Sequence, residues 1–232
     1  MIPAPVVLGA LGALAALAAA WLARRTLARL LLLAALHSVY RIRVRGLERL
    51  PEGGALLVAN HLSFVDALLV GAALPRTPAF LMHRSFFRVP LVAGFARMME
   101  TIPVASEDAP AEKAASLARA AELARAGRLV CIFAEGGISR SGVLLPFRRG
   151  LETIARDAGV PIVPVALDRV WGSVFSFSGG RVFRKWPRRV PYHVDVAVGA
   201  PLPSATPAWR VRAAVEEQIA RRSASTRTSS SP

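Results

Sequence analysis

A histidine and an aspartate five positions apart, His61 and Asp66, are the residues of this sequence best suited to do chemistry. A carboxylate that bonds one imidazole nitrogen fixes the tautomer of the ring and leaves the other nitrogen free to accept a proton. Such a pair can serve as a general base toward a hydroxyl group. The spacing alone leaves an alternative open, because a loop histidine followed by an aspartate that starts a helix gives the same pattern.

The elements that must position this pair are two apolar runs. Residues 55–59 predict a short buried strand, and residues 67–74 are long enough for a helix. His61 therefore follows a strand and Asp66 precedes a helix. Loops at such places carry the functional side chains of many α/β proteins.

A second apolar run, residues 129–133, predicts another buried strand, and a turn with Glu135, Gly136 and Gly137 follows it. Glycines let the backbone approach a ligand closely, and successive backbone amides can hold an anion. Without further information, Glu135 is equally well explained as an ordinary turn residue.

Three stretches, in order, resemble the motifs of the glycerolipid acyltransferase superfamily, which includes the lysophosphatidate acyltransferases. Asn60 to Asp66 is similar to the first motif, His-x-x-x-x-Asp preceded by Asn. Residues 133–142 (Phe-Ala-Glu-Gly-Gly-Ile-Ser-Arg-Ser-Gly) resemble the Phe-Pro-Glu-Gly-Thr-Arg-Ser block, and residues 160–166 (Val-Pro-Ile-Val-Pro-Val-Ala) resemble the Val-Pro-Ile-Val-Pro-Val block. The resemblance covers roughly residues 36–203.

The resemblance implies a fold and a set of roles. The expected fold is α/β, a mixed sheet flanked by helices, with an N-terminal membrane helix or helix pair. His61 would deprotonate a hydroxyl of the acceptor and Asp66 would orient His61. The residues implied in substrate binding are Ser63, Glu135, Gly136, Gly137 and Arg140.

The chain departs from the family pattern at the expected phosphate site. Ile138 stands where the family has its first arginine, and Val-Ala-Ser at residues 104–106 stands near the place of another. A phosphate monoester is best held by several guanidiniums, whereas a phosphodiester needs fewer. Unless Arg148 and Arg149 compensate, the departures favour lysophosphatidylethanolamine over lysophosphatidate. Residues 171–189 also resemble the acylglycerophosphoethanolamine acyltransferase domains of bacterial fusion proteins.

The charge and composition narrow the classes of partner. The net charge is +15, carried almost entirely by arginine, and 53% of the residues are hydrophobic. No zinc-ligand spacing, helix-turn-helix pattern or RNA-binding aromatic motif is present, so anionic membrane lipids are favoured over nucleic acid. The single cysteine, Cys131, excludes a disulfide within the chain.

The N-terminal segment predicts a membrane anchor. Residues 6–23 carry no charge, and three arginines follow by residue 29. As a helix the run would rise about 27 Å, close to the thickness of a hydrocarbon core. A secretory signal is the alternative, although its positively charged start is missing. The flanking arginines predict a location at the cytoplasmic face of the cell inner membrane.

The predicted organisation has three parts: an anchor or interfacial helices at residues 1–37, an acyltransferase domain at residues 38–222 and a disordered polar tail at residues 223–232. The predicted function is transfer of a fatty acyl group from acyl-CoA or acyl carrier protein to the free hydroxyl of a lysophospholipid, without a metal or cofactor.

Two other classes of function remain open. One is a catalytically silent module that binds anionic membranes. The other is a hydrolase with Ser63 or Ser139 as nucleophile, although the Gly-x-Ser-x-Gly pattern of such enzymes is absent.

Overall fold

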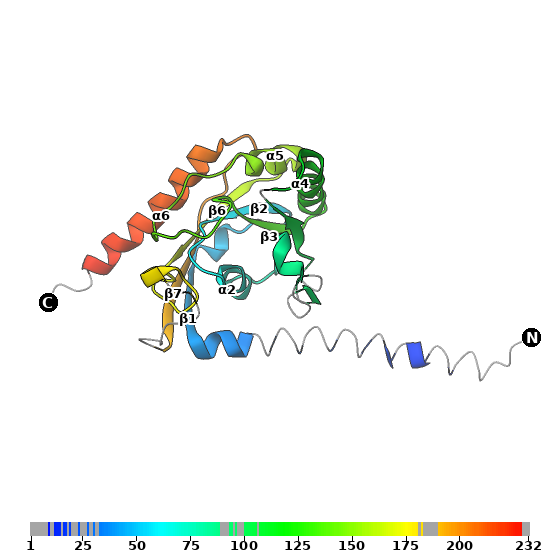
Figure 1. Ribbon diagram of the computed structural model, residues 1–232, viewed down its shortest axis with the longest axis horizontal. Helices are drawn as coiled ribbons and strands as arrows, with labels where there is room; N and C mark the ends of the chain where they lie inside the picture. The colour runs from blue at the N-terminus through cyan, green and yellow to red at the C-terminus, as the bar shows by residue number, and fades with distance from the viewer. Residues whose placement is uncertain are drawn as a thin grey trace, which may run out of the picture.

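The computed structural model describes residues 33–88, 100–105, 107–180 and 190–228, together with single positions and short stretches of two or three residues elsewhere in the chain. Within these residues the strands form one mixed sheet in the order β1-β7-β6-β2-β5-β3-β4 (Figure 1). The strands are β1 (Tyr40–Arg45), β2 (Ala55–Ala59), β3 (Ala79–His83), β4 (Ile102–Val104), β5 (Leu129–Phe133), β6 (Ile162–Asp168) and β7 (Tyr192–Val198). Neighbours are parallel except β6 and β7, which are antiparallel.

Helices cover both faces of the sheet. They are α2 (Asp66–Ala73), α4 (Pro110–Arg125), α5 (Gly150–Ala158) and α6 (Ala208–Thr228), with short 3-10 turns η1 (Leu47–Arg49), η2 (Arg84–Arg88) and η3 (Ser178–Gly180). Helix α2 packs on one face, and α4, α5 and α6 pack on the other (Figure 1). Each face holds its own apolar core, so the predicted α/β fold with a mixed sheet and flanking helices is confirmed.

The sequence explains why these elements form. All five residues of β2 are buried, because β2 lies between β5 and β6 with a helical layer on each side. Helix α5 buries Leu151, Ile154, Ala155 and Ala158, which recur at helical spacing on one face. It ends at Gly159, whose φ of 67° is the left-handed conformation of a helix C-cap.

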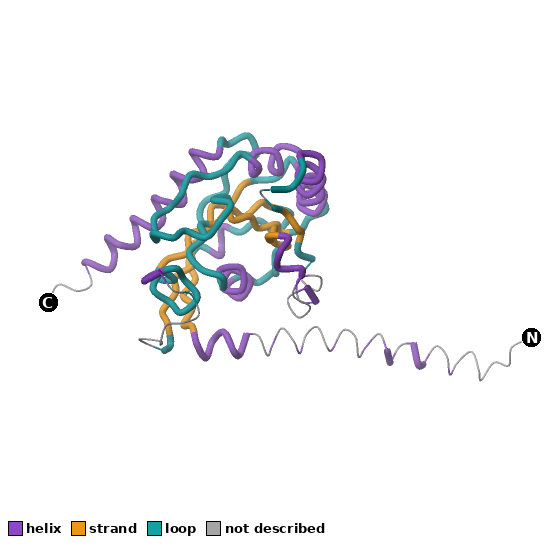
Figure 2. Tube along the Cα trace, viewed as in Figure 1, coloured by secondary structure: helices purple, strands orange, loops and turns teal. Residues whose placement is uncertain are grey.

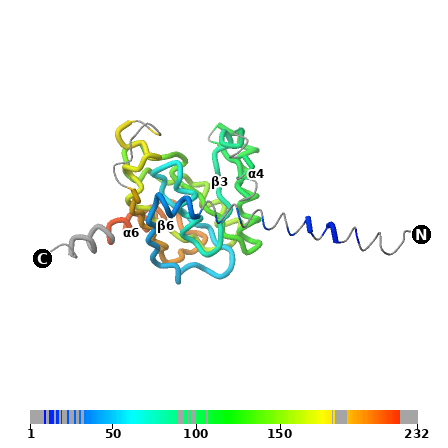
Figure 3. Tube along the Cα trace, turned by 90° about the horizontal axis from the view of Figure 1, so that it is seen from below, coloured from blue at the N-terminus to red at the C-terminus, as the bar shows by residue number. Residues whose placement is uncertain are grey.

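Different elements lie at the two sides of the molecule. Figure 3 shows β3 and α4 together at one side and β6 and α6 at the other. Figure 2 shows the same chain with its strands in orange, its helices in purple and its loops and turns in teal. The loop that leads from β2 into α2 carries His61, and the loop that leads from β5 into α5 carries Glu135.

The predicted N-terminal anchor lies mostly outside the described residues. Residues 33–39 are helical and lead directly into β1. Within the described part of the chain, no helix combines the length and the apolar character that crossing a membrane requires. The membrane helix therefore stays a prediction.

The C-terminal helix is longer than expected. The sequence predicted a disordered tail from residue 223, but α6 continues to Thr228. Residues 223–228 contain neither glycine nor proline, so nothing in this stretch stops the helix. Residues 229–232 of the predicted tail lie outside the described residues.

Candidate functional site

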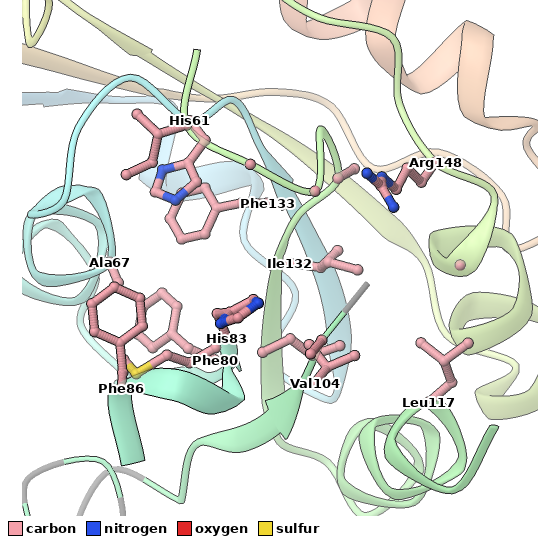
Figure 4. Close-up of a pocket in the computed structure, with 18 of the residues that line it drawn as sticks. His61, Ala67, Phe80, His83, Phe86, Val104, Leu117, Ile132, Phe133 and Arg148 are labelled. Atoms are coloured by element: carbon pink, nitrogen blue, oxygen red, sulfur yellow. The ribbon is translucent and has the colours of Figure 1, made fainter. Parts of the chain in front are cut away.

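The histidine and the aspartate singled out in the sequence meet at the start of α2. The Nδ1 atom of His61 lies 2.9 Å from the Oδ2 atom of Asp66. With Nδ1–H donating to the carboxylate, Nε2 is the nitrogen that can accept a proton. The imidazole stacks on the Phe133 ring with centroids 4.3 Å apart, and Figure 4 shows it at the wall of a cavity.

Asp66 is fully buried and its carboxylate is held from several directions. Besides His61, it accepts hydrogen bonds from the backbone amides of Leu62 (2.5 Å) and Ser63 (2.8 Å) and from the Ser63 hydroxyl (2.5 Å). The carboxylate is thus fixed in the orientation that the imidazole needs. Ser63 was expected to bind substrate; it is fully buried, and its hydroxyl holds Asp66 instead.

Glu135 joins the second motif to the first. Its Oε1 atom accepts the backbone N–H of His61 at 2.7 Å, and its Oε2 atom accepts the N–H of Leu145 at 2.9 Å. Only 5% of Glu135 is exposed. Burial raises the pKa of its carboxyl above the ordinary value, and the two backbone bonds lower it in part. In the other direction, the N–H of Ser139 donates to the His61 carbonyl at 2.9 Å.

The glycine turn brings an arginine into the site. Gly136 has a φ of 74°, and a Cβ atom there would lie 2.2 Å from the Arg148 Nε atom. Glycine, which has no Cβ atom and adopts this backbone conformation readily, thus leaves room for the Arg148 side chain in its observed position against the turn. The Arg148 N–H also donates to the Ala134 carbonyl at 2.8 Å. Gly136, Gly137 and Arg148 line the cavity (Figure 4 labels Arg148).

The cavity has a volume of about 760 Å³ and mostly apolar walls. Its polar and charged lining side chains are His61, His83, Lys113 and Arg148. None of the described residues that line it carries a carboxylate. The aromatic and aliphatic lining residues include Phe64, Leu68, Phe80, Phe86 and Leu117. This lining suits a ligand with an apolar chain and an anionic group.

Two other arginines considered in the sequence lie elsewhere. Arg140, expected to bind the acceptor, is exposed, and its Cζ atom lies 5.4 Å from the centre of the Phe177 ring. It is not one of the described residues that line the cavity. Arg149 is exposed and pairs with Glu152 at 3.3 Å. Sequence reasoning named Arg148 only as a possible compensation; Lys113 was missed, because it lies in a helix that looked like structural cover.

The serines that a hydrolase would use are not placed for that chemistry. Ser63 and Ser139 are both fully buried. The Ser63 hydroxyl donates to Asp66, and the Ser139 hydroxyl donates to the Val143 carbonyl at 2.8 Å.

Comparison with known proteins adds to the geometry. A family model described as Acyltransferase matches residues 41–168, more than half of the chain. The chain belongs to the acyltransferase family. The matched range contains the site from His61 to Arg148, whereas β7 and α6 follow it.

Individual relatives agree with this family. A chloroplastic 1-acyl-sn-glycerol-3-phosphate acyltransferase of Brassica napus is 33% identical over 61% of this chain and 41% of its own length. A 1-acyl-sn-glycerol-3-phosphate acyltransferase of Bacillus subtilis is 26% identical over 54% of this chain and 61% of its own length. The chain thus spans less than two thirds of the length of either relative.

A solved structure shares the fold. The crystal structure of the 1-acyl-sn-glycerophosphate acyltransferase PlsC from Thermotoga maritima matches with a TM-score of 0.63 and 24% sequence identity. The match covers 84% of this chain and 75% of that chain. The sheet and helices of this chain therefore have a known counterpart.

Proposed function

We propose that this chain transfers a fatty acyl group from an acyl thioester to the free hydroxyl of a lysophospholipid. The observation that carries the proposal is the His61–Asp66 pair at the wall of a largely apolar cavity that also contains cationic side chains. The apolar walls suit acyl chains, and the cations suit the phosphate of the acceptor.

The reaction follows from the position of His61. Its Nε2 atom takes the proton of the acceptor hydroxyl while the hydroxyl oxygen attacks the thioester carbonyl carbon. The tetrahedral intermediate then collapses, the C–S bond breaks, and the leaving thiolate takes the proton from His61. Asp66 keeps the imidazole in the required tautomer and stabilises the imidazolium. The donor is acyl-CoA or acyl carrier protein, and no metal or other cofactor takes part.

For the acceptor we favour 1-acylglycerol-3-phosphate over lysophosphatidylethanolamine. The missing motif arginines argued for a singly charged phosphodiester. Arg148 and Lys113, however, line the cavity and bring two positive charges from outside that motif. Two cations suit a phosphate monoester, which carries nearly two negative charges. The names of the relatives above support the same acceptor.

Anionic membrane lipids are the proposed partner, at the cytoplasmic face of the inner membrane. The net charge of +15 supports attraction to an anionic surface. Glu135, Gly136 and Gly137 would shape the acceptor site, whose cations are Arg148 and Lys113.

The test is an acyl-transfer assay with purified protein in mixed micelles. Acyl-CoA and acyl carrier protein thioesters serve as donors, and lysophosphatidate and lysophosphatidylethanolamine as acceptors. We expect higher kcat/KM with lysophosphatidate. His61→Ala and Asp66→Asn should each lower kcat by about a thousandfold. His193→Ala, at an exposed position of β7, is the control with unchanged activity.

The outcomes separate the classes of function. Release of free fatty acid without transfer to either acceptor would indicate a hydrolase. Vesicle binding by a folded protein without turnover, unaffected by His61→Ala, would indicate a catalytically silent membrane module.

A further inference from the structure

Glu135 belongs to the motif expected to hold the acceptor, but its surroundings give it another task. Both carboxylate oxygens already accept a backbone N–H, one from His61 and one from Leu145. Its neighbours Ala134 and Gly136 line the cavity, while Glu135 itself is buried and is not one of the described lining residues. Each oxygen of this carboxylate is thus engaged by a backbone N–H.

The backbone of His61 is held on both sides by one distant segment. Its N–H donates to Glu135 and its carbonyl accepts the N–H of Ser139, so residues 135–139 fix where the His61 Cα lies. Asp66 bonds the imidazole and the backbone amides of Leu62 and Ser63. The N–H and the carbonyl of His61 itself are bonded by residues 135–139. The same segment supplies Gly136 and Gly137 to the cavity wall.

The second oxygen of Glu135 bonds the segment that leads to Arg148, one of the cations that line the cavity. Leu145 precedes Arg148 by three residues, and the carbonyls of Leu144 and Leu145 accept bonds from Arg212 of α6 at 3.0 and 3.1 Å. One carboxylate therefore connects the catalytic histidine to the loop that leads to Arg148.

We propose that Glu135 is a positioning residue that sets the distance between the His61 base and the acceptor site by holding the backbone amides of His61 and Leu145. The inference rests on the proposed acyl transfer. In this proposal Glu135 does not itself contact the acceptor.

The chemistry of an amide side chain makes the proposal testable. A glutamine has one acceptor oxygen and an NH₂ group. At position 135 it can accept a hydrogen bond from only one of the two backbone N–H groups, and its NH₂ group, a donor, faces the other N–H. A buried donor without a partner shifts the loop. A misplacement of about 1 Å between reacting groups can lower the rate about a hundredfold.

The first experiment compares Glu135→Gln with the wild type in the acyl-transfer assay. We expect kcat to fall by about tenfold to a hundredfold with the KM for lysophosphatidate changed less than about twofold. Glu152→Gln is the matched control. It removes a comparable carboxylate–amide bond, from the Ala208 N–H at 2.8 Å, and should leave kcat and KM unchanged. A rise in KM with little change in kcat would place Glu135 on the acceptor and overturn the proposal.

The second experiment does not depend on turnover. Selective ¹⁵N-histidine labelling gives four backbone amide signals, since the chain has four histidines, and His61→Ala assigns one of them. A short bond to a carboxylate should move the His61 amide proton downfield of the other three. Glu135→Gln should return it upfield, and Glu152→Gln should not. An ordinary His61 shift in the wild-type protein contradicts the proposal even if the glutamine variant fails to fold.

The two experiments also distinguish this inference from the proposed function. A protein that shows the expected amide shifts but no acyl transfer keeps the Glu135 geometry and loses the proposed reaction. A protein with transfer but without the shifts keeps the reaction and loses the role of Glu135.

Discussion

At the scale of single residues, two buried carboxylates hold one histidine in different ways. Asp66 bonds the imidazole, and Glu135 bonds the backbone amide of the same residue. Asp66 accepts four hydrogen bonds from its own loop, whereas Glu135 receives its two from segments on either side of it in sequence. The position of His61 thus depends on a local and on a long-range contact.

The raised pKa of Glu135 has a consequence for stability. Because burial raises the pKa in the folded protein, the folded state keeps a proton at pH values where the unfolded chain has released it. By linkage, this contribution to the free energy of unfolding is full below the ordinary pKa of glutamate and is lost as the pH rises through the folded value. The stabilities of the wild type and Glu135→Gln should therefore converge or cross as the pH rises.

Urea unfolding at intervals from about pH 4 to pH 7 measures this difference, since the window begins near the ordinary pKa of glutamate. We expect the free energy of unfolding of the wild type minus that of Glu135→Gln to decrease as the pH rises. An increase of this difference with pH would mean that the backbone bonds outweigh burial.

At the scale of elements, hydrophobic periodicity was a reliable guide. The strands predicted at residues 55–59 and 129–133 and the helix at residues 67–74 agree with β2, β5 and α2 to within one residue. Each of these runs is apolar because its element is buried in the sheet or against it, so the pattern is written into the local sequence.

Contacts between elements that are distant in the sequence leave no such pattern in the local sequence, so they could not be predicted in this way. Glu135 and His61 are 74 positions apart, and nothing in either segment predicts that the carboxylate accepts a backbone amide. Arg140 has the position of a family arginine in sequence, yet its side chain lies on Phe177. Lys113 lies in α4 and Arg148 lies just before α5, and both side chains line the cavity where these two helices pack together. This packing brings together segments that are distant in the sequence. The family motifs therefore predicted the contact between His61 and Asp66 better than they predicted which cationic residues line the cavity.

Arg76, after α2, connects two loops at the edge of the sheet away from His61. Its Nη2 atom donates to the carbonyls of Pro51 (2.5 Å) and Gly53 (2.9 Å), and its Nη1 atom lies 3.5 Å from the Gly127 carbonyl. These loops precede β2 and β5. Arg76→Met should lower the free energy of unfolding by about 2 kcal/mol, because removing the charged guanidinium leaves these backbone carbonyls without a hydrogen-bond donor.

The measurement is urea unfolding together with kcat. Arg119→Met is the control; it removes an arginine whose partner, Glu122, lies on the exposed surface of the same helix, so the change should be below about 0.5 kcal/mol. Unchanged stability of Arg76→Met, or a large loss of kcat at unchanged stability, contradicts a purely structural role.

At the scale of the whole molecule, the positive charge should control association with lipid. Arg41, Arg43 and Arg45 are exposed along the edge strand β1. We expect cosedimentation with anionic vesicles that weakens as salt increases, and little binding to neutral phosphatidylcholine vesicles at any salt.

A pair of double variants locates the charge that matters. Arg41→Gln with Arg43→Gln should weaken binding to anionic vesicles by about 2 kcal/mol, at roughly 1 kcal/mol for each cation near the surface. Arg119→Gln with Arg125→Gln removes the same charge from α4, at the other side of the sheet, and should change binding less. Equal effects of both pairs would mean that net charge alone decides binding.

The pairing of β1 with β7 also determines the order in which the protein can assemble. Tyr40 lies opposite Tyr192, so β1 can pair with β7 only after about 150 further residues have been synthesised. Closing so long a loop costs entropy before any pairing offsets it. Strands β2 to β6 form a parallel unit that needs neither of them. The loops that carry His61 and Glu135 therefore follow strands of this parallel unit, whereas residues 40–45 can pair with β7 only after β7 has been synthesised.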